Sequence, residues 1–293
     1  MATRSGLAPA VQKSYPYNFY LPAAILFGVI FVLPTLLSFY FSLTRWTLFD
    51  SEFIGLENFA QFLREPSLVN GLRNTVIYAV VTTALKVIVG LLLAALLTSS
   101  LRVRNLLRSI IFFPVLVSTV AVGITFAVLL HPSRGLINVA LETIGIDGPS
   151  WLTDPSIALL SVALVDVWKG VGIALVIFIA GIVSIPEVYN DAVRLEGGTW
   201  AKFRYVTVPL SRNATFTVIL LAFIGGLRTF DLIWTMTKGG PGFTTDVLAS
   251  TIYKQYQAGF YGLATAGNVI FFILVALLVY PMMRWFARKE IDL

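Results

Sequence analysis

The sequence predicts an all-α membrane protein whose chain crosses the lipid bilayer six times. Of its 293 residues, 57% are hydrophobic and only 12% are charged, a balance that soluble domains do not show. The mean hydropathy is +0.85. The apolar residues form long runs between short polar segments, and a helix needs about 20 such residues to cross the hydrocarbon core. A soluble enzyme therefore fits this chain poorly.

Six apolar runs define the expected spans, with boundaries blurred by aromatic residues at their ends. The first run is too long for a cleavable signal peptide and follows Arg4 and Lys13, so we interpret it as a retained span. Residues 1–18 are then an N-terminal segment, 19–283 one transmembrane domain and 284–293 a C-terminal tail. The spans run from Phe19 to Leu43, Thr75 to Leu97, Ile110 to Leu130, Ile157 to Ile185, Ala214 to Met236 and Ala264 to Met283.

The distribution of Lys and Arg predicts that both termini are cytoplasmic. With that orientation, twelve of the 21 cations lie in inner segments, six lie in outer loops and three lie within spans. Short cytoplasmic loops of membrane proteins carry this excess of positive charge. The formal net charge of +6 is thereby explained by topology, and a nucleic-acid partner is not implied. The first outer loop contains a short helical candidate, IGLENFAQFL, residues 54–63.

Several kinds of chemistry are excluded by what the sequence lacks. There is no cysteine, so no disulfide, thiolate nucleophile or zinc–thiolate site can form, and His131 is the single histidine. We expect no metal site and no catalytic residues. No G-x-x-x-x-G-K-[ST] phosphate loop occurs, so any nucleotide must be bound by another protein.

The segment 186–210 between the fourth and fifth spans is the longest inner connection. It predicts two short helices, 187–195 and 200–206, with a reversal at Gly197 and Gly198 and an end before Pro209. A solvated connector would have the same composition. The segment resembles the EAA loop of binding-protein-dependent ABC transporter permeases, although its first acid, second alanine and length depart from the family pattern. The matching positions are Asp191, Ala192, Val193, Glu196, Gly197, Gly198, Val206, Val208 and Pro209.

A second resemblance to the same family lies in the last outer loop. The stretch from Phe230 to Ala266 contains the Thr-x-Gly-Gly-Pro core of sugar-type permeases at Thr237, Gly239, Gly240 and Pro241. GLENF, residues 55–59, is also similar. Together these motifs resemble carbohydrate-importer permeases of the maltose-transporter type, with the type I permease fold, and the likeness extends over nearly the whole chain.

This resemblance implies a division of labour among several subunits. The family works as two homologous permeases in a prokaryotic cell (inner) membrane, two cytoplasmic ATPase subunits that bind ATP and Mg, and an extracytoplasmic sugar-binding protein. The chain itself is then a non-catalytic transport subunit without a cofactor. Its EAA-like segment is implied to be the element that contacts the ATPases.

Five ionisable residues lie within the expected spans, where a charge costs roughly 2.5 to 3.5 kcal/mol on insertion scales. They are Lys86, Asp166, Lys169, Arg228 and Asp231. The i,i+3 spacings of Asp166 with Lys169 and of Arg228 with Asp231 predict two ion pairs, each on one helix face. Lys86 is expected to pair with a neighbouring span or to reach the interface. The pairs could serve packing alone, or they could belong to a polar pocket.

The alternative to packing is a substrate pocket between the fourth and fifth spans. In maltose-type permeases the mid-membrane site is built from the corresponding positions, and polar groups with aromatic faces suit a sugar. An oligosaccharide is the expected cargo, with an acidic polyol such as a glycerol phosphate as the alternative. An ion-driven secondary transporter and an intramembrane enzyme remain competing classes. The expected pocket residues are Asp166, Trp168, Lys169, Gly170, Ile173, Gly225, Gly226, Arg228 and Thr229.

Overall fold

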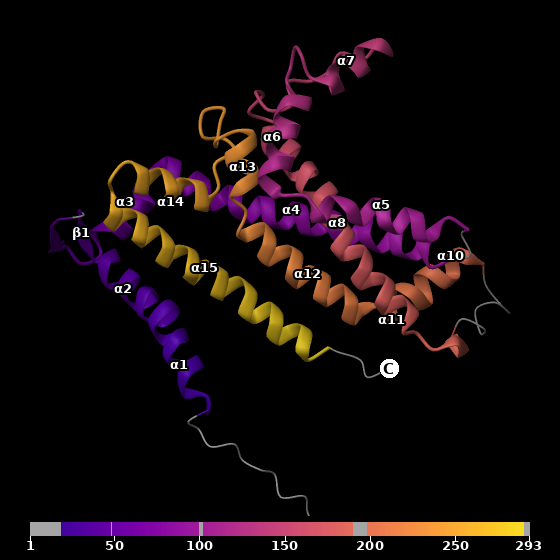
Figure 1. Cartoon of the computed structure of the whole chain (residues 1–293), viewed down its shortest axis with the longest axis horizontal. Helices are drawn as coiled ribbons and strands as arrows, with labels where there is room; N and C mark the ends of the chain where they lie inside the picture. The colour runs from indigo at the N-terminus through magenta and orange to yellow at the C-terminus, as the bar shows by residue number, and fades with distance from the viewer. Residues whose placement is uncertain (1–18, 48, 100–101, 190–197, 290–293) are drawn as a thin grey trace, which may run out of the picture.

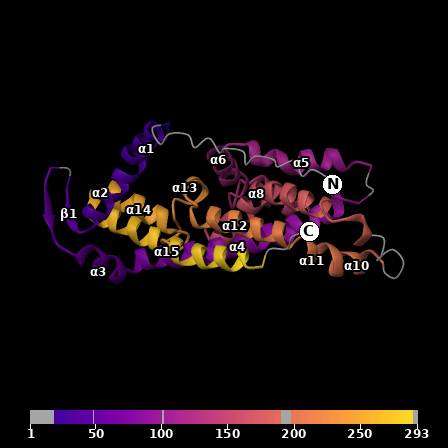
Figure 2. The ribbon, with the colours of Figure 1, turned by 90° about the horizontal axis from the view of Figure 1, so that it is seen from below.

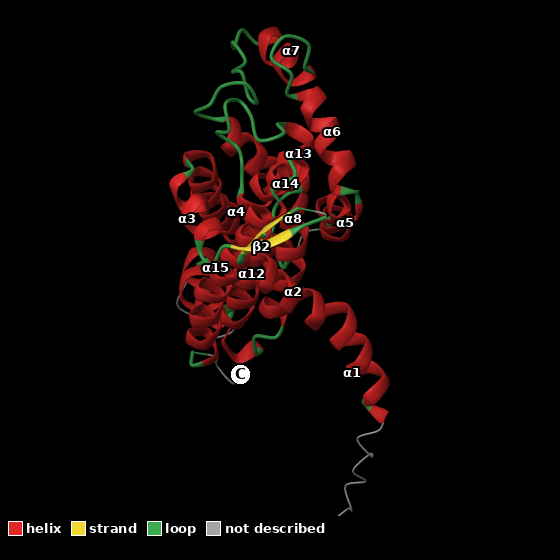
Figure 3. Ribbon diagram, turned by 90° about the vertical axis from the view of Figure 1, so that its left-hand side faces the viewer, coloured by secondary structure: helices red, strands yellow, loops and turns green. Residues whose placement is uncertain are grey.

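A computed structural model describes residues 19–47, 49–99, 102–189 and 198–289. The regular secondary structure of the described residues is helical apart from one short antiparallel hairpin, and loops join these elements, as Figure 3 shows. The elements are α1 Leu21–Phe27, η2 Gly28–Val32, α2 Leu33–Ser42, β1 Thr44–Trp46, β2 Ser51–Phe53, α3 Glu57–Arg64, α4 Pro66–Leu97, α5 Arg104–Leu116, α6 Thr119–Leu129, α7 Leu136–Thr143, α8 Ala158–Val183, α10 Thr199–Lys202, η3 Phe203–Thr207, α11 Val208–Leu210, α12 Arg212–Leu227, α13 Asp231–Met236, α14 Leu248–Gln257 and α15 Tyr261–Ala287.

Four of the expected spans are confirmed as helices long and apolar enough to cross a membrane. They are Leu21–Ser42, Pro66–Leu97, Ala158–Val183 and Tyr261–Ala287. Within the first, not one residue of the apolar window is buried by the rest of the described chain, so this helix needs lipid or another subunit around it.

The third and fifth spans are not straight helices in the structure. The chain bends by 98° between Arg104–Leu116 and Thr119–Leu129, where Val117 and Ser118 adopt extended backbone just after Pro114. The fifth run is divided at residues 228–230, between α12 and α13. A second bend, of 66°, lies between Thr199–Leu210 and Arg212–Leu227. Counting this pair and the bent pair of the third span as one span each gives up to six spans among the described residues.

The centre of the bundle is built on α4, which packs against α8 and α12. These helices run side by side along the long axis in Figures 1 and 2. Close approach requires small residues: a Cβ at Gly90 would lie 2.8 Å from the Ala174 Cβ, and one at Gly226 would lie 2.7 Å from the Ala79 Cα. α15 packs against α2, α3 and α14 at the hairpin end of the molecule.

Two helices contain a π-helical turn that ends two residues before a proline. Gly28–Val32 precedes Pro34, and Phe203–Thr207 precedes Pro209. A proline inside an α-helix clashes with the carbonyl four residues back, and a wider turn relieves that conflict. The helix expected to stop before Pro209 therefore continues through it to Leu210.

The end of the bundle that carries the β1–β2 hairpin also carries α3 and α14, whereas α10 and α11 lie at the opposite end (Figure 1). The helix expected within residues 54–63 is confirmed as α3. Its buried Asn58 donates hydrogen bonds to the carbonyls of Ser42, at 2.9 Å, and Thr44, at 2.8 Å. This side chain fastens α3 to the start of the hairpin.

Candidate functional site

A hollow of about 240 Å³ lies between α4, α8 and α12, beside the start of α6. It brings together five of the expected pocket residues: Asp166, Lys169, Gly170, Ile173 and Gly225. The first four share one face of α8 because they follow helical spacing. Its other walls are Lys86, Thr119, Ala174, Ile177, Val218, Leu221 and Ala222.

The carboxylate of Asp166 pairs with a different lysine from the one that the sequence spacing predicts. The Lys86 Nζ lies 2.8 Å from Asp166 Oδ2, joining α4 to α8, and the two side chains are only 10% and 20% exposed. Within the described ranges, no ion pair of Lys169 is found. The expected Asp166–Lys169 pair was therefore wrong, while the expectation that Lys86 pairs with a neighbouring span is confirmed.

Gly170 makes room for this pair. A Cβ at Gly170 would lie 2.7 Å from the Lys86 Cε and 3.0 Å from its Nζ, so any larger residue would displace the lysine. The hydroxyl of Tyr78 is buried close to Asp166 and Thr229 and has no hydrogen-bond partner of good geometry in the described structure. The ion pair thus sits in a tightly built polar cluster within the bundle.

Four of the expected pocket residues do not line the hollow. Trp168 packs against Phe126, with ring centroids 5.1 Å apart. Gly226 is buried where α12 meets α4. Arg228 caps the end of α12 and Thr229 lies in the break that follows.

The second expected intrahelical pair is also not formed. Arg228 and Asp231 make no ion pair in the part of the chain that the structure describes. The chain leaves the helix between them, since Phe230 has φ −144° and ψ −55°, so the i,i+3 geometry is lost. The prediction failed because an apolar run was treated as one continuous helix.

Only part of the expected coupling segment can be described. Asp191, Ala192, Val193, Glu196 and Gly197 lie outside the described residues. Gly198 has extended backbone at the start of α10, Val206 is buried in η3 and Pro209 lies in α11.

A hollow of about 310 Å³ lies on the helical stretch formed by α10, η3 and α11. Two large aromatic side chains stand out from it, Trp200 at 68% and Tyr205 at 71% exposure. Exposed aromatic residues of this kind are typical of contacts between proteins. The remaining lining residues are Phe203, Arg204 and Val208.

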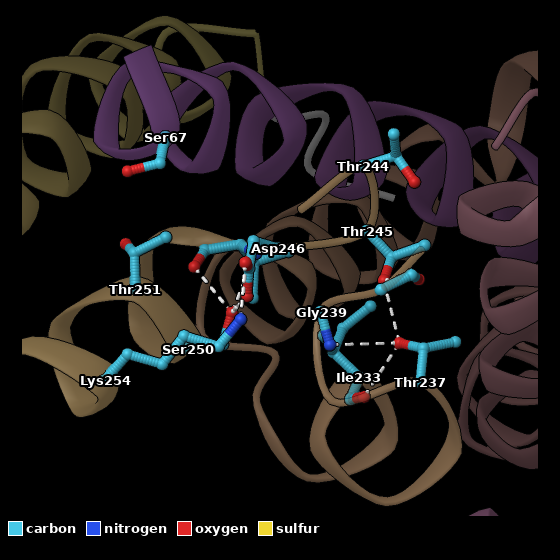
Figure 4. A network of polar contacts seen from close by, with 12 residues as sticks. Ser67, Ile233, Thr237, Gly239, Thr244, Thr245, Asp246, Ser250, Thr251 and Lys254 are labelled. Carbon is cyan, nitrogen blue, oxygen red and sulfur yellow. Dashed lines mark hydrogen bonds and ion pairs between the residues drawn. The ribbon is translucent and has the colours of Figure 1, made fainter. Parts of the chain in front are cut away.

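The loop with the Thr-x-Gly-Gly-Pro core is held by a polar network centred on the buried Asp246 (Figure 4). Asp246 accepts from the Ser250 hydroxyl and pairs with Lys254, each at 2.7 Å. Gly239, at φ +86°, is required because a Cβ there would collide with the Asp246 carboxylate. The same loop is tied to α4, since the Asn74 amide donates to the carbonyls of Thr244 and Asp246.

A larger hollow of about 440 Å³, which the sequence reading missed, lies at the hairpin end between α14 and α15. Six aromatic rings dominate it, and none of the described residues that line it is charged. Asn268 supplies an amide on the α15 wall. The lining residues are Trp46, Phe230, Ala249, Ile252, Tyr253, Tyr256, Tyr261, Ala264, Thr265, Asn268 and Phe271.

Comparison with known families matches residues 86–291 to the binding-protein-dependent transport system inner membrane components. The chain belongs to this family. The matched region includes the Lys86–Asp166 pair, the segment 186–210 and the outer loop, so the family resemblance drawn from the sequence is confirmed.

Relatives are similar along nearly their whole length. The chain is 33% identical to a probable ABC transporter permease, YurN, of Bacillus subtilis over 289 residues, covering 95% of this chain and 98% of the relative. It is 30% identical to the trehalose/maltose transport permease MalF of Thermococcus litoralis over 262 residues, covering 88% and 89% of the two chains.

The fold also has a counterpart among solved structures. A bacterial ABC transporter involved in the import of the acidic polysaccharide alginate matches with a TM-score of 0.82 at 22% identity, covering 94% of this chain and 96% of that one. The all-α permease fold is thereby confirmed. As a family member, the chain is a multi-pass transport subunit of the membrane and not an enzyme.

Proposed function

We propose that this permease forms half of the translocation pathway of an ATP-driven importer of carbohydrate, with an oligosaccharide as cargo. The hollow between α4, α8 and α12 carries this proposal, because it places polar side chains within the bundle where a solute must cross. The trehalose/maltose permease relative supports sugar as the substrate class.

The aromatic hollow at the hairpin end supports a cargo of more than one sugar ring. Rings such as Trp46 and Tyr256 offer faces on which pyranose rings stack, and the Asn268 amide offers hydrogen bonds. The two hollows are built on different helices. Phe230, which lines the hollow at the hairpin end, lies five residues beyond Gly225, which lines the hollow between α4, α8 and α12. An extended substrate could occupy both in succession.

Energy is proposed to enter through the segment 186–210. Its described part, with Trp200 and Tyr205 exposed, is a surface for a cytoplasmic ATPase subunit that binds ATP and Mg. Both termini are then cytoplasmic, and the remaining partners are a homologous second permease and an external binding protein. The unburied helix Leu21–Ser42 is available to lipid or to that second permease.

Reconstituted liposomes separate this proposal from ion-driven transport. Uptake of labelled maltotriose and arabinotriose is measured with internal ATP, the ATPase subunits and the binding protein present together, and with each omitted. Uptake should require all of them, because alternating access needs a free-energy source that acts differently on the two states. Sugar accumulation by this chain alone, driven by an ion gradient without nucleotide, would reject the proposal. An intramembrane enzyme would instead alter the sugar chemically, which mass spectrometry detects.

A further inference from the structure

We propose that the transported carbohydrate carries an anionic group, a carboxylate, phosphate or sulfonate, and that Lys169 binds it in the hollow between α4, α8 and α12. This inference rests on the proposed function and narrows its substrate class. It starts from a charge imbalance. Of the residues that the structure describes, three charged side chains line the hollow, Lys86, Asp166 and Lys169, and among these the first two neutralise each other.

The charge of Asp166 is already balanced by Lys86. Its Oδ2 accepts a hydrogen bond of 2.8 Å from Lys86, and Lys86 is only 8% exposed as a residue. The lysine chain passes close to Gly170, where a Cβ would lie 2.7 Å from the Lys86 Cε. Breaking this pair would leave a buried ammonium without a counter-charge, which is strongly unfavourable. Lys86 and Asp166 therefore neutralise each other, and among the described residues that line the hollow Lys169 is the cation left without an ion pair.

The surroundings of Lys169 favour an anionic ligand over a neutral one. Ile173 stands one turn further along α8, and Val218, Leu221 and Ala222 of α12 line the same hollow. Apolar walls lower the local dielectric constant relative to bulk water, which strengthens the attraction between an ammonium and an anion. A neutral sugar could accept a hydrogen bond but would leave the charge uncompensated, whereas an anionic group forms a shorter, charge-assisted bond.

The absence of native cysteine permits a direct test of the local potential. Ile173 is 46% exposed, so an Ile173→Cys variant places the single thiol of this chain beside Lys169. The assembled importer in nanodiscs is treated with anionic sulfonatoethyl and cationic trimethylammonioethyl methanethiosulfonate, and modification of this chain is followed by mass spectrometry. Adding Lys169→Met should lower the anionic-to-cationic rate ratio by about fivefold or more, from the loss of one nearby unit charge. Lys169→Arg should preserve the ratio, and Arg64→Met, at an exposed cation on α3, should not change it.

Ligand class is tested on the same thiol by protection. Trigalacturonate should slow modification of the Ile173→Cys thiol, whereas its neutral methyl ester should protect at least tenfold less well. The difference between the two probes should vanish with Lys169→Met and persist with Lys169→Arg. An unchanged rate ratio after Lys169→Met would show that another group, such as a carboxylate of the second permease, already neutralises the lysine, and would overturn the inference. Equal protection by acid and ester, or no protection by either, would overturn it too.

The thiol experiments test the anionic cargo, and the uptake experiment tests the ATP-driven importer, so either proposal can fail without the other. ATP-driven uptake of neutral sugars with no charge preference at Lys169 rejects the anionic cargo but leaves the importer assignment standing. Failure of ATP to drive uptake of any sugar, with the thiol results as expected, rejects the importer assignment while Lys169 remains an anion-binding group.

Discussion

Replacing Asp166 should destabilise the protein more than replacing Lys86, although the two residues form one ion pair with each other. The Asp166→Asn change leaves the Lys86 ammonium buried with no carboxylate, and such a loss costs about 3 to 5 kcal/mol. The Lys86→Met change leaves Asp166 beside Lys169, three residues further along the same helix, which is a feasible replacement partner. Its cost should be lower, about 1 to 3 kcal/mol.

Thermal unfolding of the purified permease complex in detergent, followed by the loss of monodisperse protein, measures this difference. At roughly 2 to 4 °C per kcal/mol, Asp166→Asn should lower the apparent midpoint by on the order of 10 °C, and Lys86→Met by clearly less. The double variant Lys86→Met/Asp166→Asn should have a higher midpoint than Asp166→Asn, since no uncompensated buried charge remains at the pair. Adding Lys169→Met to Lys86→Met should lower the midpoint further, because it deletes the replacement partner of Asp166.

The outcome that refutes this reasoning is equal destabilisation by the two single variants, because it would mean that Lys169 cannot reach Asp166. Additive behaviour in the double variant would show that the 2.8 Å contact carries no coupling.

Three further changes test other parts of the structure. Gly226→Ala should destabilise the protein by about 1 to 3 kcal/mol through overpacking against the α4 backbone, whereas Gly225→Ala, whose Cβ would meet nothing within 4 Å, should be tolerated in the same thermal assay. Gly239→Ala should loosen the outer loop, because its φ is positive and its Cβ would strike Asp246; increased limited proteolysis at residues 238–246 is the readout, and an unchanged pattern would contradict the packing argument. Gly197→Val should leave the protein inserted but abolish transport and substrate-stimulated ATP hydrolysis by the complex, and normal transport would remove the segment 186–210 from the coupling role.

Hydropathy alone was sufficient for the class of fold and for four straight spans, because the length of an apolar run is fixed by the thickness of the bilayer. It could not find the breaks at residues 117–118 and 228–230, since an apolar sequence looks the same whether its helix is straight or bent. The wrong prediction of an Arg228–Asp231 ion pair has the same cause, because their i,i+3 spacing brings them together only within one continuous helix.

Charge pairing failed for a different reason. The i,i+3 rule correctly identified Asp166 as a residue that needs a cation, but spacing along one helix says nothing about a neighbour from another. Lys86 is 80 positions away in the sequence, and only the packing of α4 on α8, with Gly170 at the crossing, brings it to 2.8 Å. The sequence signal that was available is Gly170, four residues after Asp166, because a glycine one helical turn from a carboxylate leaves room for a side chain from another helix.

The π-helical turn at Phe203–Thr207 has a consequence for the length of the chain at this point. A π turn holds one residue more than the α turn it replaces, so the segment contains a surplus residue within an otherwise regular helix. With Pro209→Ala, which removes the clash that the wide turn relieves, deleting one residue there would let the turn adopt α geometry without rotating α12, whereas the same deletion in a regular α turn would rotate everything beyond it by about 100°. In the Pro209→Ala background, a one-residue deletion near the coupling segment should therefore be tolerated at this turn and rejected on either side of it.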